Sequence, residues 1–129
     1  MSQVTFTEVV AREEHSTVIR IGLPMLVEGE QLAAVREAIA HEAGADAGTL
    51  ILDLRAVRWL DSAALGWFIS LRNELIQRGR AFQPPSRRGT LLACFTDAAA
   101  ALEMVRQGGS DPLLLCGVCP EVNEILVVS

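Results

Sequence analysis

A continuous apolar run near the middle of the chain constrains the fold more than any other feature. Thr49 to Leu54 (TLILDL) has the length of a strand and lacks polar alternation, so it indicates a strand that is buried on both faces. Asp61 and Ser62 follow after a short connection, and residues of these types favour the start of a helix. That helix is expected to end near Arg78, because Gly79 is a typical stop. A buried strand followed by a helix indicates an α/β fold.

The segments on either side extend this pattern. Val4 to Val10 alternates apolar and polar residues, Arg12 to His15 is a polar turn, and Ser16 to Gly22 returns as a strand, so we expect a hairpin. The other expected elements are a helix over Glu30 to Glu42 stopped by Gly44, a strand over Leu91 to Phe95, a helix from Thr96-Asp97 to Gln107, a strand over Leu113 to Val118 and a helix opened by Pro120. Residues 1–129 are therefore expected to form a single domain, with a mixed β-sheet, an N-terminal hairpin, βα units and helices packed on the sheet.

The charge and composition of the chain argue against nucleic acid and membrane as partners. Half of the 129 residues are hydrophobic and 21% are charged, which is typical of a globular domain, and the formal net charge is −5. The densest basic spot, Arg87-Arg88, is too small to form a nucleic-acid groove. The apolar runs at 98–102 and 112–118 are too short to span a bilayer, so we expect no direct membrane insertion.

The amino terminus and the cysteines bear on the location of the protein. The first ten residues, MSQVTFTEVV, lack the basic and apolar regions of a secretory signal. The three cysteines, Cys94, Cys116 and Cys119, leave one thiol over in any pairing scheme, which suits a reducing compartment. We therefore expect a cytoplasmic protein.

The sequence contains no recognisable enzymatic motif. It has no P-loop, G-x-S-x-G, H-E-x-x-H or G-x-G-x-x-G pattern, and its two histidines have no catalytic neighbours. Ser62 lacks an obvious base within the chain, so a self-contained hydrolase is not expected. We expect no enzymatic activity, no cofactor and no metal ion. Cys116 and Cys119 leave a dithiol oxidoreductase open as an alternative, although buried, inert thiols are the more common outcome.

Ser62 is the first candidate for a functional residue. A hydroxyl at the start of a helix lies beside free backbone N–H groups and the positive end of the helix dipole, which together hold a phosphate. The position also follows a buried strand, at the edge where open α/β sheets place their chemistry. Two interpretations remain: Asp61 and Ser62 only cap the helix, or Ser62 is a phosphoacceptor. Asp53, inside the strand, is expected to be a structural carboxylate.

Two tryptophans flank this candidate site. Trp59 lies in the connection before the helix, where we expect it to contribute to a contact surface. The apolar stripe of the helix consists of Ala64, Phe68, Leu71 and Leu75. Trp67 lies off this stripe, so we expect it to be half-buried, either as packing or as an anchor for a partner.

The segment around Ser62 resembles the signature of STAS domains. The resemblance rests on Ile51 to Leu54, on Val57 and on Asp61 to Gly66 (DSAALG). STAS domains occur in bacterial anti-sigma factor antagonists, in stressosome proteins and at the carboxyl ends of sulfate transporters. In the antagonists the pattern is roughly D-S-S-G-L-G, and a partner kinase phosphorylates the serine directly after the aspartate. The resemblance therefore implies a STAS-like fold and phosphorylation of Ser62.

The sequence departs from the family pattern in three places. Ala63 and Ala64 replace the second serine and the first glycine, and the added methyl group is expected to narrow a partner's approach. An atypical segment at about residues 80–112 stands where the family usually passes directly into its next strand. It indicates either an inserted loop and helix or another way of building the sheet edge. The chain also ends at Ser129, where family members often continue into a closing strand and helix.

The resemblance implies a phosphorylation-controlled protein-binding switch that acts as an anti-sigma factor antagonist. The implied partner is an anti-sigma factor and serine kinase of GHKL type, opposed by a phosphatase, and phosphorylation is expected to release the partner by charge repulsion. The candidate partner-binding residues are Trp59, Asp61, Ser62, Ala63 and Trp67. The alternative is a constitutive STAS scaffold subunit of a stressosome-like or transporter-associated complex, in which the chain forms an oligomer and Ser62 only caps the helix.

Overall fold

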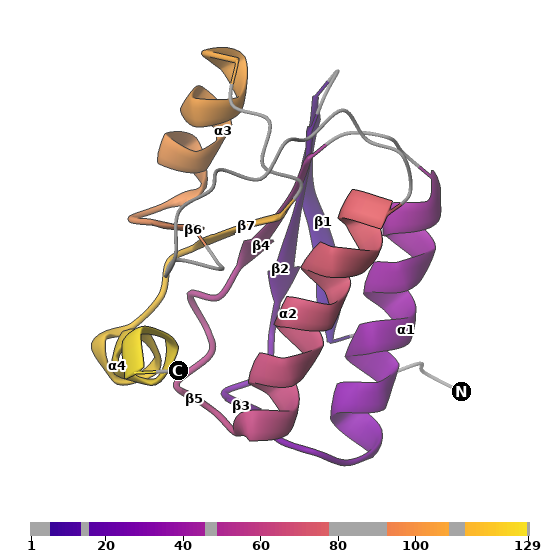
Figure 1. Cartoon of the computed structure of the whole chain (residues 1–129), viewed down its shortest axis with the longest axis vertical. Helices are drawn as coiled ribbons and strands as arrows, with labels where there is room; N and C mark the ends of the chain where they lie inside the picture. The colour runs from indigo at the N-terminus through magenta and orange to yellow at the C-terminus, as the bar shows by residue number, and fades with distance from the viewer. Residues whose placement is uncertain (1–5, 14–15, 46–48, 78–92, 109–112, 129) are drawn as a thin grey trace.

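The computed structural model describes residues 6–13, 16–45, 49–77, 93–108 and 113–128. Their centre is a five-stranded sheet with the strand order β1-β2-β4-β7-β6 (Figure 1). The strands are β1 (Thr7–Glu13), β2 (Ser16–Ile21), β4 (Thr49–Asp53), β6 (Ala93–Phe95) and β7 (Leu113–Cys116). β1 and β2 form an antiparallel hairpin, and β2, β4, β7 and β6 are parallel to one another. The sheet is therefore mixed, with the antiparallel pair at one edge.

Helices cover both faces of this sheet. α1 (Glu30–Ala45) and α2 (Ser62–Gln77) lie on one face, and α3 (Ala98–Arg106) lies on the other (Figure 1). Leu52 belongs to the core beneath α1 and α2, whereas Ile51 belongs to the core beneath α3, which explains why the central run has no polar face. α4 (Pro120–Val128) follows β7. None of the described helices is long and apolar enough to cross a membrane.

A two-stranded parallel ladder follows the carboxyl ends of β2 and β4. It joins β3 (Met25–Leu26) to β5 (Trp59–Leu60). The carbonyl of Pro24 accepts hydrogen bonds from the N–H groups of Arg58 (2.7 Å) and Trp59 (3.1 Å). The second residue of each strand is fully buried and the first is exposed. The sequence patterns do not predict this ladder, because two residues are too few to show a period.

β1 forms ion pairs with helices on both faces of the sheet. A bulge in the middle of the strand changes the face to which the following residues point. Beyond the bulge, Arg12 forms an ion pair with Glu42 of α1, and Glu13 forms one with Arg106 of α3. The outer strand is thereby connected to a helix on each side of the sheet.

The fold class and the order of the elements predicted from the sequence are confirmed, but several boundaries differ. β2, β4 and β7 end at Ile21, Asp53 and Cys116 rather than at Gly22, Leu54 and Val118, and β1 and α1 differ as well. β1 covers residues 7–13 rather than 4–10, of which 4 and 5 lie outside the described residues. Arg12 is therefore in a strand and not in the expected turn, because pairing with β2 outweighs the polar composition. α1 does not stop at Gly44 but continues to Ala45, since a helix tolerates an interior glycine at a cost of about 1 kcal/mol.

Part of the atypical segment at about residues 80–112 builds the edge of the sheet. Of this segment the structure describes residues 93–108, which contain β6 and α3. β6 is the edge strand beside β7, and α3 packs Ala101 into the core on its face of the sheet. The described part of the segment therefore contributes both an edge strand and a helix to the fold.

Candidate functional site

Asp61 joins two separate segments at the start of α2. Its Oδ1 atom accepts a hydrogen bond from the backbone N–H of Ala64 (2.9 Å), which caps the helix. Its Oδ2 atom accepts one from the backbone N–H of Glu28 (3.0 Å), in the loop between β3 and α1. The backbone N–H of Asp61 donates to the carbonyl of Leu26 (3.1 Å). One residue therefore fixes the start of the helix and the loop after β3 to each other.

The same N–H donors stabilise the charged form of Asp61. The hydrogen bond from Glu28, followed by that from Ala64, holds the pKa of the Asp61 carboxyl below its usual value. The carboxylate is therefore ionised at neutral pH. It also occupies an amide at the helix start that a phosphate bound there would otherwise use.

Ser62 is the first residue of α2, and its side chain is exposed. The next two residues turn progressively inward: Ala63 is half-buried and Ala64 is fully buried in the core beneath α1 and α2. The methyl group of Ala64 therefore packs inside the protein and does not narrow the surface around Ser62, contrary to the expectation from the sequence. Ser62 itself is therefore exposed to solvent.

The two tryptophans differ in how much of each residue is exposed. Trp59, on β5, is 49% exposed. Trp67 is only 7% exposed and lies in the core, with its ring centre 5.1 Å from that of Phe68 and the two rings inclined by 35°. It is more buried than expected and belongs to the same core as the apolar stripe of α2, so the covered part of this helix is wider than the stripe. Trp59 and Ser62 are thus exposed and Asp61 is partly exposed, whereas Trp67 belongs to the core.

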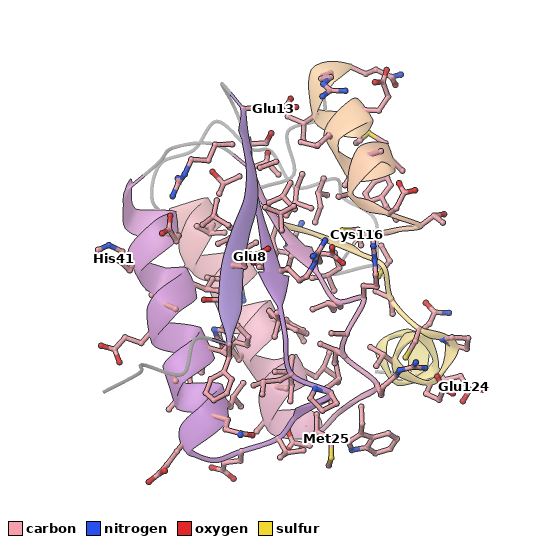
Figure 2. All side chains as sticks on the ribbon, turned by 180° about the vertical axis from the view of Figure 1, so that it is seen from behind. Glu8, Glu13, Met25, His41, Cys116 and Glu124 are labelled. Atoms are coloured by element: carbon pink, nitrogen blue, oxygen red, sulfur yellow. The ribbon has the colours of Figure 1, made fainter. Side chains whose placement is uncertain are left out.

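Met25 is a surface residue that the sequence patterns miss. It is 51% exposed and lies opposite Trp59 in the register of β3 and β5. Figure 2 shows its side chain pointing away from the body of the protein. The only signal in the sequence is the preceding Pro24, which indicates a break in the chain but no partner strand.

A comparison with known families identifies the fold that carries this site. The family model described as STAS domain matches residues 8–82, from β1 to beyond the end of α2. The chain belongs to the STAS domain family. The resemblance found around Asp61 and Ser62 is thereby confirmed, and so is the STAS-like fold. No curated protein matches the chain.

Inside this STAS domain, Asp53 has the structural role that the sequence indicates. Its buried side chain forms an ion pair with Arg20 (Oδ2 to Nε, 3.2 Å), and its Oδ1 atom accepts the backbone N–H of Arg55 (3.0 Å). Gly117 passes close by with a φ of +68°, and a Cβ atom there would lie 2.8 Å from Asp53 Oδ1. The carboxylate therefore joins the ends of β2 and β4 to the loop that follows β4, and the turn after β7 passes close to it.

The thiols of Cys116 and Cys119 belong to different cores of the protein. Cys116 and Cys119 are both free, and they pack on opposite sides of the sheet, against the core beneath α3 and the core beneath α1 and α2 respectively. Burial, followed by the charge of Asp53, raises the pKa of Cys116 to about 12. The Cys119 thiol donates to the carbonyl of Val57 (3.4 Å). Within the described residues, no three His, Cys, Asp or Glu side chains are grouped as a metal site requires.

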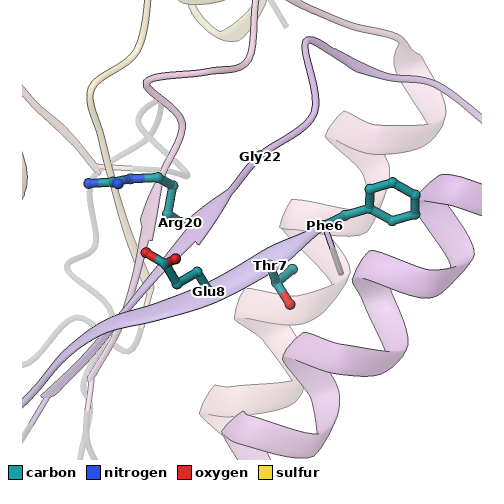
Figure 3. A pocket seen from close by; sticks show the side chains of 5 residues that line it. All are labelled: Phe6, Thr7, Glu8, Arg20 and Gly22. Atoms are coloured by element: carbon teal, nitrogen blue, oxygen red, sulfur yellow. The ribbon is translucent and has the colours of Figure 1, made fainter. Parts of the chain in front are cut away.

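An open hollow lies at the end of the hairpin of the STAS domain (Figure 3). Its volume is about 330 Å³, and its lining residues are Phe6, Thr7, Glu8, Arg20 and Gly22. The guanidinium of Arg20 is already paired with Asp53. None of the candidate partner-binding residues lines this hollow, so it is separate from the surface around Ser62.

Proposed function

We propose that this STAS domain is a phosphorylation-controlled protein-binding switch that acts as an anti-sigma factor antagonist, with Ser62 as the phosphoacceptor. The observation that carries the proposal is the exposed side chain of Ser62, beside the ionised carboxylate of Asp61, at the start of α2. An exposed serine can enter the active site of another protein, which then supplies the base that this chain lacks. STAS domains are generally binding domains, and this supports a role in binding.

The proposed modification changes the charge at one edge of the binding surface. A kinase transfers the γ-phosphoryl group of ATP to Ser62 Oγ: the new O–P bond forms, the bond to ADP breaks, and the hydroxyl proton passes to the kinase or to water. The product carries a charge of about −2 beside the Asp61 carboxylate. Because Asp61 already binds the N–H of Ala64, that amide is not free to stabilise the phosphate.

The partner that fits this change is an anti-sigma factor with serine kinase activity of GHKL type. Such a kinase brings the phosphates of its nucleotide to Ser62, and after the transfer the phosphoserine repels them, which weakens the complex. Trp59 and Ala63 belong to the same proposed contact surface, with Trp67 packed behind them. A phosphatase would restore the hydroxyl and the binding-competent form. In this proposal the cycle takes place in the cytoplasm, without nucleic acid or membrane as a direct partner.

The test compares wild type with Ser62→Ala and Ser62→Asp as immobilised bait. Ser70→Asp is the matched control, because it adds the same charge at another exposed position of α2. Bound proteins from native lysate are identified by mass spectrometry, and phosphate on Ser62 is measured after addition of ATP. We expect a GHKL-type kinase to bind wild type, Ser62→Ala and Ser70→Asp, but not Ser62→Asp. Equal binding to all four proteins without phosphate on Ser62 would refute the switch.

The second candidate is a constitutive scaffold subunit, as in stressosome-like or transporter-associated complexes. The observation that favours it is the capping of α2 by Asp61, which accounts for an aspartate at this position without any phosphate. Here Ser62→Asp leaves assembly unchanged. Light scattering of the purified variants distinguishes the two candidate functions. Only the scaffold predicts an oligomer whose size is the same in wild type and Ser62→Asp.

A further inference from the structure

Two of the exposed apolar side chains of the described residues are direct neighbours. The large apolar residues that are exposed are Val10, Met25, Trp59 and Met104. Met25 and Trp59 lie opposite each other in the register of β3 and β5, and about half of each side chain is exposed (51% and 49%). Because neighbouring strands are about 4.8 Å apart, the two side chains form one apolar surface. This surface is called the Met25–Trp59 pair below.

The backbone beneath the Met25–Trp59 pair is held in place. Leu26 and Leu60, the next residue of each strand, are fully buried. The carbonyl of Pro24 binds two N–H groups of the opposite segment, and the N–H of Asp61 binds the carbonyl of Leu26. The pair therefore needs little ordering before it binds, which reduces the entropic cost of an interaction. A rigid tryptophan beside an adaptable methionine is typical of protein-binding surfaces.

The segments that frame the pair carry an excess of negative charge. Residues 22–29, 55–62 and 119–124 contain the carboxylates of Glu28, Asp61, Glu121 and Glu124, and the guanidinium groups of Arg55 and Arg58. The pKa of Asp61 is lowered chiefly by the N–H of Glu28, and that of Glu121 chiefly by its own backbone N–H, so both are ionised at neutral pH. Glu124 projects outward from α4 (Figure 2). A complementary partner is therefore positively charged around its apolar group.

We propose that the Met25–Trp59 pair is the docking surface for a protein segment that carries a large apolar side chain flanked by Lys or Arg. The apolar side chain packs on Met25 and Trp59, and its basic neighbours face Glu28 and Glu121. The inference rests on the proposed binding function but not on the phosphorylation of Ser62. A kinase would then contact the domain at two points, with its nucleotide at Ser62 and its basic segment at the pair, and phosphorylation would repel only the nucleotide.

The experiment is a selection from a phage-displayed library of random peptides of about 12 residues, with unphosphorylated wild-type protein as bait. We expect enriched peptides to share a large apolar residue with Lys or Arg on either side. Resynthesised peptides are then measured by fluorescence anisotropy. Met25→Ser or Trp59→Ala should weaken binding by about tenfold or more, as the loss of an interface anchor does. Met104→Ser, which removes an exposed methionine of α3, is the matched control and should leave the affinity unchanged.

Charge variants keep the test independent of any effect on folding. Glu28→Lys with Glu121→Lys leaves the apolar pair intact and should weaken the basic peptides while circular dichroism stays that of wild type. Three results would overturn the proposal. The enriched peptides lack a basic excess, they bind Met25→Ser and Trp59→Ala with the same affinity as wild type, or no peptide is enriched. Ser62→Asp should retain the peptides. If the domain binds these peptides but Ser62 is never phosphorylated, the proposed switch is disproved and the proposed docking surface is not.

Discussion

The carboxylate of Asp61 binds the backbone N–H of Glu28, 33 residues earlier in the chain, while its other oxygen caps α2 through Ala64. Two loops that arrive at the surface from different strands are thereby held by one side chain. The residue after Asp61 is Ser62, so any change of charge at Ser62 acts next to this joint.

Replacement of Asp61 by alanine should destabilise the domain by about 1–2 kcal/mol, the upper half of the range for the loss of a helix cap. The control is Asp97→Ala, because Asp97 caps α3 through Ala100 but, among the residues that the structure describes, accepts no second hydrogen bond of the kind that Asp61 accepts from Glu28. Urea unfolding of both variants measures the difference. An equal or smaller loss for Asp61→Ala would show that the bond to Glu28 contributes nothing to stability.

The charge of Asp61 should make the stability of the domain depend on pH in the acid range. Its folded-state pKa is below the ordinary value of 3.8, because the N–H groups of Glu28 and Ala64 stabilise the carboxylate. The stabilisation is therefore present above 3.8 and is lost as the pH falls through the lower folded-state pKa. Asp61→Asn keeps an acceptor oxygen but has no charge to lose. The difference in unfolding free energy between wild type and Asp61→Asn should be constant near pH 7 and should shrink below about pH 4. A difference that is independent of pH would contradict this account.

Two glycine substitutions should change stability in opposite directions. Gly117→Ala places a methyl group 2.8 Å from Asp53 Oδ1 on a backbone with a φ of +68°, and should cost about 1–3 kcal/mol. Gly66→Ala, inside α2, meets nothing within 4 Å and should stabilise the domain by about 0.5–1 kcal/mol. Thermal unfolding followed by circular dichroism gives both signs. A neutral Gly117→Ala would mean that Asp53 and the turn after β7 can separate without cost.

The thiol of Cys116 should be unreactive in the folded protein. With a pKa of about 12, a result of burial and the charge of Asp53, only about one molecule in ten thousand carries a Cys116 thiolate at pH 8. Iodoacetamide should therefore label Cys116 only after unfolding, as peptide mass mapping would show. Oxidised glutathione should give no bond between Cys116 and Cys119. Rapid labelling of Cys116 in the native state would restore the dithiol hypothesis.

The two arginine ion pairs should differ in their contribution to stability. Arg20→Met leaves the buried carboxylate of Asp53 without its cation and should cost about 1–3 kcal/mol. Arg106→Met removes a guanidinium from the ion pair with Glu13, whose side chain stays in contact with water, so little change is expected. Urea unfolding compares the two. Similar losses for both variants would show that the burial of Asp53 does not control the cost.

The parts of the fold that the sequence predicts are those in which local pattern and tertiary contacts agree. The run from Thr49 to Leu54 is apolar because helices cover both faces of β4, and Asp61 lies before α2 because its carboxylate caps that helix. Both features are visible in a short window of sequence. The same holds for Asp97 before α3.

The parts that the sequence does not predict depend on contacts between distant residues. β3 and β5 exist because Pro24 and the segment around Trp59 meet in space, and two residues carry no period. The burial of Trp67 likewise depends on core contacts that the apolar stripe of a single helix does not show. The sequence therefore does not predict Met25 as a surface residue, although it indicates Trp59, the neighbour of Met25 across the ladder.

In the short ladder of β3 and β5, the residues that stabilise the fold are different from the residues of the proposed docking surface. In each strand one residue enters the core, as Leu26 and Leu60 do, and its neighbour faces out. Substitutions at Met25 and Trp59 can accumulate without disturbing the packing beneath them. After gene duplication, two copies with the same core can acquire different partners through these two positions, and a protein engineer can retarget the domain in the same way.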